Sequence, residues 1–332
     1  MIGEARVSVH RGAGVESEHR VAWATTDSDG GRARARAGGM SSAAYPGPRI
    51  FARSASKPFQ ALRGVRAGVL ERFGLASEHL ALACGSHGGS DDHVRRVREI
   101  LHAAGRDETD LACGVSEPRD PAAARALHDA GGGPEPVRHN CSGKHAFGVA
   151  FAVAEGWPVE GYLDAGHPLQ EAMERGMAEA TRVEPGELAR AVDGCGMQTF
   201  SVPIARLAAA FGRLASGGLG AAGEQLASAM TDHPELVAYD GALDTEMMRA
   251  HPRLVSKIGA EGVIALGLPD GRGAALKVLD GAPRALDLVA PLLVEEYWGI
   301  ELAGAGLARL RDPPVLNSRG EQVGRAEARL AA

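Results

Sequence analysis

The chain contains very little lysine. Of its 36 Lys and Arg residues only four are lysines, namely Lys57, Lys144, Lys257 and Lys277. Arginine is always charged, whereas a lysine amine can lose its proton when it is buried or lies near other positive charges. The four lysines therefore indicate sites that need a compact amine or one that can release its proton.

Other shortages limit the class of protein. No apolar run approaches the roughly 18 residues needed to cross a bilayer. The first ten residues, MIGEARVSVH, lack the basic start and apolar core of a signal peptide. The net charge is -6 and the arginines are scattered, so we expect no basic face for nucleic acid. These features predict a cytoplasmic protein with neither a membrane nor a nucleic-acid partner.

Cysteine is also scarce, with four residues at Cys84, Cys113, Cys141 and Cys195. In a cytoplasmic protein these are better interpreted as thiols or metal ligands than as disulfides. Hydrophobic residues are abundant, at 45% of the chain, and so is glycine, with 45 residues. This composition is typical of a globular protein with a large core and many close backbone approaches.

The pattern along the chain predicts strands at both ends and helices between them. Residues 77–130 and 167–250 are mostly helical by their apolar spacing. Strand patterns are found at 5–10 and 19–26, in a hairpin formed by 261–268 and 274–281, and in a closing hairpin over 313–330. We therefore predict an α/β fold of the α+β kind in one domain over residues 1–332. Its antiparallel sheet is built from both termini, and about 75–250 forms a helical lobe.

The first candidate site is the segment RSASKPFQ, in which Ser54 precedes Lys57 by three positions. The apolar spacing is helical from Ser54 to Phe73, and Pro58 fits a helix only in its first turn. Ser54 and Lys57 would then lie one turn apart at a helix start. There the amine can accept the serine proton, and backbone N–H groups favour an oxyanion. The simpler interpretation is a capping serine followed by an exposed lysine.

A second serine, Ser86, lies beside His87 in the glycine-flanked segment CGSHGGS. Flanking glycines allow close approach to a ligand, although an ordinary turn between helices has the same composition. An early Ser-x-x-Lys followed late in the chain by Lys257 and a glycine is the order found in acyl-transfer enzymes of the penicillin-recognising type. In those enzymes the late lysine lines the cleft beside a second serine. Lys277 alternates with apolar neighbours and is interpreted as a lysine at the rim.

The segment HNCSGKH, residues 139–145, concentrates possible metal ligands. Cys141 and Lys144 share one helix face, and the later segment DGCG adds Cys195. Two thiolates with nitrogen donors suit zinc. Residue types alone favour a histidine as the third ligand, because a lysine must first be deprotonated. Buried thiols beside an anion-binding helix start would give the same pattern without a metal.

Taken together, these segments resemble the L-asparaginase II family, that of the Rhizobium etli-type asparaginases. The resemblance extends from about residue 7 to about residue 325 and is carried, in the order the family shows, by VHRGAGVESEHR, RSASKPFQAL, HNCSGKHA, DGCGMQTF, KIGAEG and ALKVLDG. The combination of HNCSGKH with DGCG is highly specific. The resemblance implies a single catalytic domain with a fold similar to that of serine β-lactamases and serine glutaminases. It further implies a zinc cofactor, L-asparagine as the small-molecule substrate and a homodimer as the assembly.

The resemblance also implies roles for individual residues. Ser54 with Lys57 and Ser86 with Lys257 would form two catalytic Ser–Lys pairs. The remaining residues are Arg53, His139, Asn140 and Asp193 at the substrate, and Cys141, Lys144 and Cys195 at the zinc. Two segments depart from the family pattern. KIG replaces the more usual KTG, which weakens the expected anchoring of a substrate carboxylate, and CGSHGGS replaces ASHSGE, which changes the expected pocket shape.

These residues predict an L-asparagine amidohydrolase that releases L-aspartate and ammonia. A neutral Lys57 would accept the proton of Ser54, which attacks the side-chain amide and forms an acyl-enzyme. Ser86 and Lys257 would pass a proton to the departing ammonia, while zinc orients the substrate.

Two alternatives from other classes remain open. One is a serine glutaminase or penicillin-recognising hydrolase, in which the cysteine–lysine zinc pattern would have no purpose. The other is a catalytically silent protein that binds zinc or an amino acid. An exposed Lys57 lying far from Ser86 would favour that second alternative.

Overall fold

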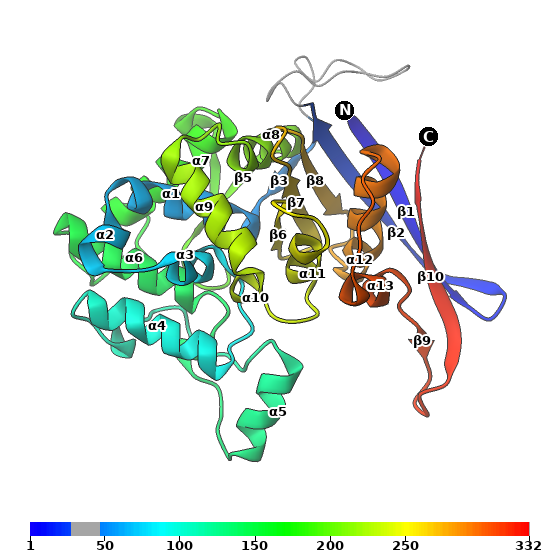
Figure 1. Cartoon of the computed structure of the whole chain (residues 1–332), viewed down its shortest axis with the longest axis horizontal. Coiled ribbons are helices and arrows are strands. Elements are labelled where there is room, and N and C mark those ends of the chain that lie inside the picture. The colour runs from blue at the N-terminus through cyan, green and yellow to red at the C-terminus, as the bar shows by residue number, and fades with distance from the viewer. Residues whose placement is uncertain (28–46, 332) are drawn as a thin grey trace.

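The computed structural model describes residues 1–27 and 47–331 of the chain. The sequence also predicts a loop over 38–49, and most of that loop lies outside the described residues. Figure 1 shows a helical part on one side and, on the other, a sheet that contains the strands near both termini. Within the described ranges, no helix combines the length and the apolar character needed to span a membrane.

The main sheet has seven antiparallel strands in the order β6-β7-β8-β2-β1-β10-β9, and a smaller sheet has the order β3-β5-β4. The two ends of the chain meet in the main sheet, where Ala5 of β1 lies opposite Leu330 of β10. The strands are β1 (Ile2–Arg11), β2 (Gly14–Thr26), β3 (Arg49–Phe51), β4 (Ala189–Val192), β5 (Gln198–Pro203), β6 (Val255–Gly259), β7 (Val263–Gly267), β8 (Gly273–Val278), β9 (Val315–Leu316) and β10 (Gln322–Leu330).

Helices form the lobe beside the sheet and also pack against the sheet itself. The α-helices are α1 (Lys57–Arg66), α2 (Val69–Phe73), α3 (Ser77–Cys84), α4 (Asp91–Ala103), α5 (Pro121–Asp129), α6 (Ser142–Glu155), α7 (Pro168–Thr181), α8 (Ile204–Ala215), α9 (Ala221–Asp232), α10 (Pro234–Val237), α11 (Leu243–Ala250), α12 (Arg284–Leu292) and α13 (Ala305–Arg311). A 3₁₀ helix, η1 (Arg53–Ser56), directly precedes α1.

Both faces of the main sheet are covered. Helix α8 packs against β2, β7 and β8, while α12 packs against β1 and β10. In β7, Val263 and Ala265 belong to the core shared with the helical lobe, whereas Ile264 and Leu266 belong to a second core with α12. A strand buried on both faces has no polar side to show, which explains the continuous apolar run of β7.

The predicted α+β fold is confirmed. The sheet is antiparallel and is formed by the two ends of the chain, and helices fill most of the region between them. The hairpins predicted over 261–281 and 313–330 are present as β7–β8 and β9–β10.

The structure differs from the predicted elements in three places. The region 167–250 contains β4 and β5 besides its helices, and all of β5 is buried, so it lacks the alternation that identifies a half-buried strand. The helix predicted over 54–73 is divided, because Gly68 adopts a left-handed φ of 73° between α1 and α2. Lys257 lies on a strand of its own, β6, ahead of the predicted hairpin.

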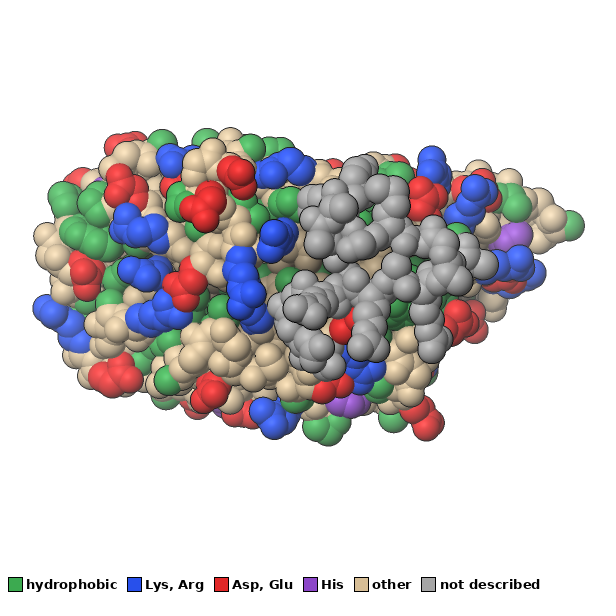
Figure 2. All heavy atoms as spheres, turned by 90° about the horizontal axis from the view of Figure 1, so that it is seen from above, with side chains coloured by type: hydrophobic (Ala, Val, Ile, Leu, Met, Phe, Trp, Pro, Cys, Tyr) green, Lys and Arg blue, Asp and Glu red, His purple; other side chains and the backbone are tan. Residues whose placement is uncertain are grey.

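The surface shown in Figure 2 is the face at the top of Figure 1, around α7 and α8. On this face Lys and Arg side chains lie among Asp and Glu side chains and do not gather into one basic stripe. Arg66, at the end of α1, contacts Glu179 of α7 at 2.5 Å. In such a pair, charges of opposite sign compensate one another locally.

Candidate active site

One cavity of about 480 Å³ collects most of the predicted site residues. This volume suits a small-molecule ligand. The predicted residues that line it are Arg53, Ser54, Ser86, His139, Asn140, Cys141, Asp193 and Cys195. The three remaining predicted residues, Lys57, Lys144 and Lys257, are buried. The structure thus brings together segments that are far apart in the sequence.

Ser54 lies in η1, which is held between the two sheets. The preceding Ala52 donates its N–H to Phe200 of β5 at 3.0 Å. On the other side β6 approaches closely at Gly259, where a Cβ atom would come within 2.6 Å of the Ala52 carbonyl oxygen. Arg53 adopts a left-handed φ of 49°, which is uncommon for a residue other than glycine. The half-buried Ser54 hydroxyl forms no hydrogen bond to a described residue, so it is free to meet a ligand.

Ser86 lies in the loop between α3 and α4, and α10 anchors this loop. The Ser86 N–H donates to the Val237 carbonyl at 2.7 Å. A Cβ atom on Gly85 would lie 2.6 Å from the Leu236 carbonyl oxygen. Glycine is therefore required at position 85 for the loop to approach the α10 backbone.

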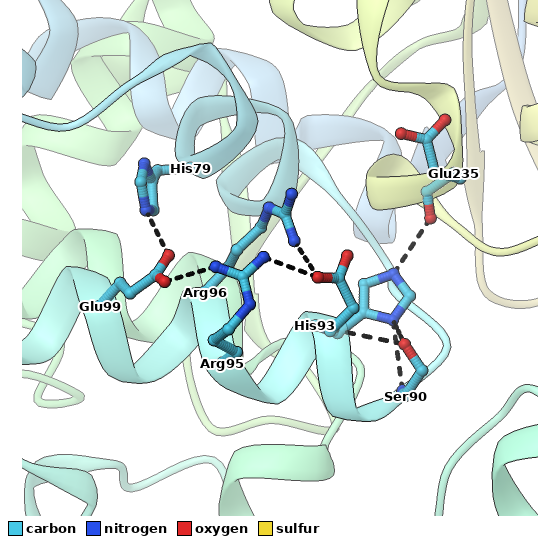
Figure 3. Close-up of polar contacts among 8 residues, drawn as sticks. His79, Ser90, His93, Arg95, Arg96, Glu99 and Glu235 are labelled. Carbon is cyan, nitrogen blue, oxygen red and sulfur yellow. Dashed lines mark hydrogen bonds and ion pairs between the residues drawn. The ribbon is translucent and has the colours of Figure 1, made fainter.

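The start of α4 fixes the other end of this loop (Figure 3). His93 lies with Nδ1 2.6 Å from Ser90 Oγ, the capping hydroxyl, and with Nε2 3.0 Å from the Glu235 carbonyl oxygen of α10. Burial lowers the pKa of His93. The His87 ring stacks on His93 with centroids 5.0 Å apart, and its Nε2 lies 2.9 Å from Ser142 Oγ. The segment that carries Ser86 is therefore held from both sides.

Lys57 is the first residue of α1, and its buried amine meets three oxygen acceptors. Nζ donates to the Gly85 carbonyl, to Ser86 Oγ at 3.1 Å and to the Asn140 carbonyl at 3.2 Å. Burial, together with the positive charge of two neighbouring lysines, lowers the pKa of Lys57 to about 8. This lysine is 1% exposed and contacts Ser86. A catalytically silent protein would be favoured by an exposed Lys57 far from Ser86, and neither condition is met.

Lys257 on β6 pairs with Asp244 of α11. The distance from Nζ to Oδ2 is 2.8 Å, and neither side chain is exposed. The same carboxylate accepts hydrogen bonds from Ser256 Oγ at 2.9 Å and from the Ile258 N–H at 3.0 Å. Lys257 therefore has a counter-charge that the sequence analysis did not identify.

These contacts differ from the predicted Ser–Lys pairs. Among the described residues no hydrogen bond joins Ser54 to Lys57, and none joins Ser86 to Lys257. Instead Lys57 contacts Ser86, because the first residue of α1 faces the loop after α3. Lys257 contacts an aspartate, because a fully buried ammonium requires a partner of opposite charge.

The residues predicted to bind substrate include an ion pair in the cavity wall. Arg53 donates from Nε and Nη2 to Asp193 Oδ1 at 3.0 and 2.8 Å. His139 accepts a hydrogen bond at Nδ1 from the Cys141 N–H at 3.0 Å, and burial lowers the pKa of its ring. The wall therefore presents a cation, an anion and a neutral imidazole.

Two charged residues of the cavity wall were not predicted, Arg119 and Glu261. Arg119 lies in the exposed loop before α5 and forms no ion pair with a described residue. Glu261 belongs to the turn between β6 and β7. Exposed charges in loops carry no periodic signal, although the quoted segment KIGAEG already contained Glu261.

The three predicted zinc ligands lie close together. Lys144 Nζ donates to Cys195 Sγ at 3.2 Å. A hydrogen bond from Cys141 lowers the pKa of Cys195 and raises that of Cys141 itself. Burial alone would lower the pKa of Lys144, but its interactions with Cys195, Cys141 and Asp193 outweigh it, so this pKa is raised. The cluster is thus a hydrogen-bonded thiol–thiolate pair beside an ammonium.

A buried histidine nitrogen lies beside this cluster. Nε2 of His145 has no well-aligned hydrogen bond to a described residue, but the ring interacts with the Cys195 sulfur, and each group shifts the pKa of the other. Two thiols, an amine and an imidazole nitrogen are a donor set that fits zinc. In the described ranges no three His, Cys, Asp or Glu side chains form a metal-binding group. Zinc at the cysteine–lysine set therefore stays a prediction.

Comparison with known proteins places the whole arrangement in context. A family model described as L-asparaginase II matches residues 7–328. A search among curated proteins gives no match. The matched region contains every residue that lines the cavity. Because the match covers nearly the entire chain, the protein belongs to the L-asparaginase II family.

Proposed function

We propose that the protein is an L-asparagine amidohydrolase that forms a serine acyl-enzyme and releases L-aspartate and ammonia. Membership of the family implies an amidohydrolase. The observation that supports the serine mechanism most is the Lys57 amine in contact with Ser86, beside the cavity lined by both serines. A lysine with a pKa of about 8 has an appreciable neutral fraction near neutral pH and is suited to general-base catalysis.

Ser54 is the proposed nucleophile. Ser54 is half-buried in the cavity wall, and its hydroxyl forms no hydrogen bond to a described residue. Nucleophilic attack by this hydroxyl therefore breaks no existing hydrogen bond. Ser86 is 3% exposed and already accepts a hydrogen bond from Lys57. Ser54 also lies directly before the N-terminus of α1, where backbone N–H groups favour developing negative charge.

The proposed reaction has two halves. Ser54 Oγ bonds to the side-chain carbonyl carbon of asparagine while its proton passes to neutral Lys57. The carbon–nitrogen bond then breaks, and Lys57 returns the proton through the Ser86 hydroxyl to the departing amine, which leaves as ammonia. Water attacks the resulting ester and gives a proton to Lys57, which passes it to the leaving Ser54 oxygen. The second product is L-aspartate.

The amino-acid end of the substrate carries one charge of each sign. The wall presents matching charges in Arg53 and Asp193, and Arg119 adds a cation that no described side chain neutralises. His139 and Asn140 supply neutral polar groups at the same wall. We propose that these side chains orient the substrate, with the Arg53–Asp193 pair setting the position of its backbone groups.

Cys141, Lys144 and Cys195 are the proposed zinc ligands, and His145 is the alternative nitrogen donor. Zinc held there would supply a Lewis acid that orients the substrate. The nucleophile and the base are separate residues, Ser54 and Lys57. Loss of zinc is therefore expected to raise KM more than it lowers kcat.

The Lys144→Arg variant is expected to lose zinc or to bind it far more weakly, because a guanidinium group does not give up a proton to donate a lone pair. Elemental analysis after dialysis measures this. Lys277→Arg is the matched control, since Lys277 lies on β8 and donates to the Val278 carbonyl at 2.7 Å, and it should keep full zinc. Full zinc in Lys144→Arg would remove lysine from the coordination shell and favour His145.

Activity is expected to rise from neutral toward alkaline pH with a midpoint near 8. Lys57 accepts a proton only as the free amine, and burial lowers its pKa to about 8. Below that pH the ammonium form predominates and activity falls, whereas above it the amine predominates. The measurement is kcat/KM against pH. A profile that peaks at acidic pH and declines steadily above it would exclude lysine as the base.

Ammonia release from L-asparagine tests the function itself. The purified protein should hydrolyse L-asparagine, with L-glutamine and a chromogenic β-lactam as comparison substrates and Ser54→Ala as the blank. Faster hydrolysis of glutamine or the β-lactam would favour the corresponding alternative enzyme. Stoichiometric binding of asparagine or zinc without turnover would favour the silent binding protein.

A further inference from the structure

Among the described residues of the cavity wall, one carboxylate has no role in the proposed reaction. Glu261 lines the cavity and is exposed. Its carboxylate forms no hydrogen bond or ion pair with a described residue. Lys277 Nζ reaches the same turn, but it donates to the carbonyl oxygens of Glu261 and Val278. The Glu261 carboxylate is therefore open to a ligand.

The backbone at Glu261 is strained. Its φ of 61° lies in the left-handed region, which glycine enters far more easily than glutamate. In the described ranges four residues other than glycine have a positive φ, and two of them, Arg53 and Glu261, line this cavity. Strain of this kind concentrates at ligand-binding and active sites. It therefore indicates a function for the glutamate side chain.

The carboxylate of Glu261 packs against the loop that follows β8. A Cβ atom added at Gly281 would come within 2.7 Å of Glu261 Oε2, and Gly281 has a φ of 81°. Glycine is therefore required at position 281 for the two segments to meet. Gly281 and Pro283 also line the cavity, so the loop 279–283 and the turn at Glu261 form one part of its wall.

Three side chains connect this loop to β2 and to the start of α12. Asp280 Oδ2 lies 2.6 Å from His19 Nδ1, and Asp280 Oδ1 accepts from the Ala282 N–H at 3.0 Å. Arg284 donates from Nε to His19 Nε2 and from Nη2 to Ser17 Oγ, both at 2.9 Å. Because a guanidinium only donates, Nε2 of the ring accepts and Nδ1 donates to Asp280. The two oxygens of Asp280 therefore serve two different donors.

These contacts give a place to segments that the proposed reaction leaves unused. VHRGAGVESEHR and ALKVLDG carry the resemblance but contain none of the predicted site residues. The structure joins them through His19 and Asp280. The segment KIGAEG supplies Glu261, against which the loop after ALKVLDG packs. The three segments thus meet at the same part of the cavity wall.

The amino-acid end of L-asparagine needs a negative partner as well as a positive one. Asp193 Oδ1 already accepts two hydrogen bonds from Arg53 and one from the Gly194 N–H at 2.7 Å. The Arg53–Asp193 pair therefore helps to place these groups but carries no net charge. Arg119 offers an unpaired cation to the α-carboxylate, and Glu261 offers the unpaired anion that suits an α-ammonium group.

We propose that Glu261 binds the α-ammonium group of the substrate and that His19, Asp280 and Arg284 position it through the loop 279–283. This inference rests on the proposed function and deepens it, because it makes the site selective for amides that carry an α-amino group. Glu261 is then a substrate-binding residue. The other three are positioning residues that act through the loop.

Succinamic acid is the direct probe, because it has the amide and the carboxylate of L-asparagine but no ammonium group. The unaltered protein should show a lower kcat/KM for succinamic acid than for L-asparagine. Glu261→Gln keeps the length of the side chain and removes its charge. It should raise KM for L-asparagine by about 10-fold or more, since a hydrogen bond between charged groups is lost. It should leave kcat nearly unchanged and have no effect on succinamic acid.

Glu296→Gln is the matched control. Glu296 is also exposed and forms no ion pair with a described residue, but it does not line the cavity. Neither substrate should respond to this variant.

Asp280→Asn tests the positioning residues, because the amide offers one acceptor oxygen to two donors. Hydrogen exchange in the loop 279–283 should become faster, and KM for L-asparagine should rise by less than in Glu261→Gln. Succinamic acid should again be unaffected, whereas a general loss of stability would change both substrates together. Faster exchange with an unchanged KM would overturn the positioning role. If Asp280→Asn does not fold, Glu261→Gln, an exposed substitution, still tests the contact with the ammonium group.

Binding to the Ser54→Ala protein separates this inference from the proposed function, since it needs no turnover. Calorimetry should show tighter binding of L-asparagine than of succinamic acid, and adding Glu261→Gln should remove that difference. Equal affinities, absence of L-asparagine binding, or a preference that survives Glu261→Gln would overturn the inference. Failure of the proposed function would instead appear as no ammonia release from L-asparagine by the unaltered protein.

Discussion

Ser54→Ala is expected to lower kcat by at least about 1,000-fold, since removal of a nucleophile leaves only binding and electrostatic contributions. The fold should be retained, because the Ser54 hydroxyl makes no hydrogen bond to a described residue and its loss leaves no partner unsatisfied. Steady-state ammonia release measures kcat, and a thermal melt shows whether the protein is intact.

Ser86→Ala is the matched control for this prediction. This variant also removes a serine hydroxyl from the cavity wall, and with it the hydrogen bond that Lys57 donates to Ser86. If Ser86 only relays a proton, the loss in kcat should be roughly 100-fold, which is typical of a single proton-transfer group. Near-normal activity in Ser54→Ala combined with an inactive Ser86→Ala would reverse the assignment and make Ser86 the nucleophile.

Lys57→Met is expected to lower kcat by about 100- to 10,000-fold and to remove the rise in activity near pH 8. Methionine is similar in length and apolar, so it fits the buried position without supplying a base. Arginine should not restore activity, because its guanidinium stays protonated. The measurement is kcat/KM across the pH range for each variant.

The control for the lysine variants is Lys277→Met on β8, which should keep activity within about twofold. A Lys57→Met protein that retains the alkaline rise would show that another group controls the pH dependence. Added small primary amines provide a further check. They should restore part of the activity to a Lys57→Ala variant, whose smaller side chain leaves room for the amine, and have no effect on Ser54→Ala.

The sequence predicted the fold wherever the local pattern was sufficient. Alternating strands at the two ends and the two hairpins are local signals, and each is present. The small sheet was missed because β5 is buried on every residue and pairs with β3, a segment far away in the sequence. Such a pairing has no local signature.

The site was predictable as a set of segments but not as a set of contacts. Ser54, Ser86 and Cys141 come from different parts of the chain, and only the quoted motifs indicated that they line one cavity. The partner of each lysine depends on how α1 and β6 are oriented in the core. Asp244 carried no signal, because one acid within a helical pattern is indistinguishable from a surface residue until its burial is known.

Trapping the covalent intermediate tests the serine mechanism most directly. The protein is mixed with L-asparagine, quenched in acid during turnover, digested and analysed by tandem mass spectrometry. We predict an aspartyl ester on Ser54, within the peptide that begins after Arg53, and no such ester in the Ser54→Ala protein. Ammonia release at full rate with no ester on Ser54 or Ser86, or with the aspartyl group on a cysteine, would contradict the proposed mechanism.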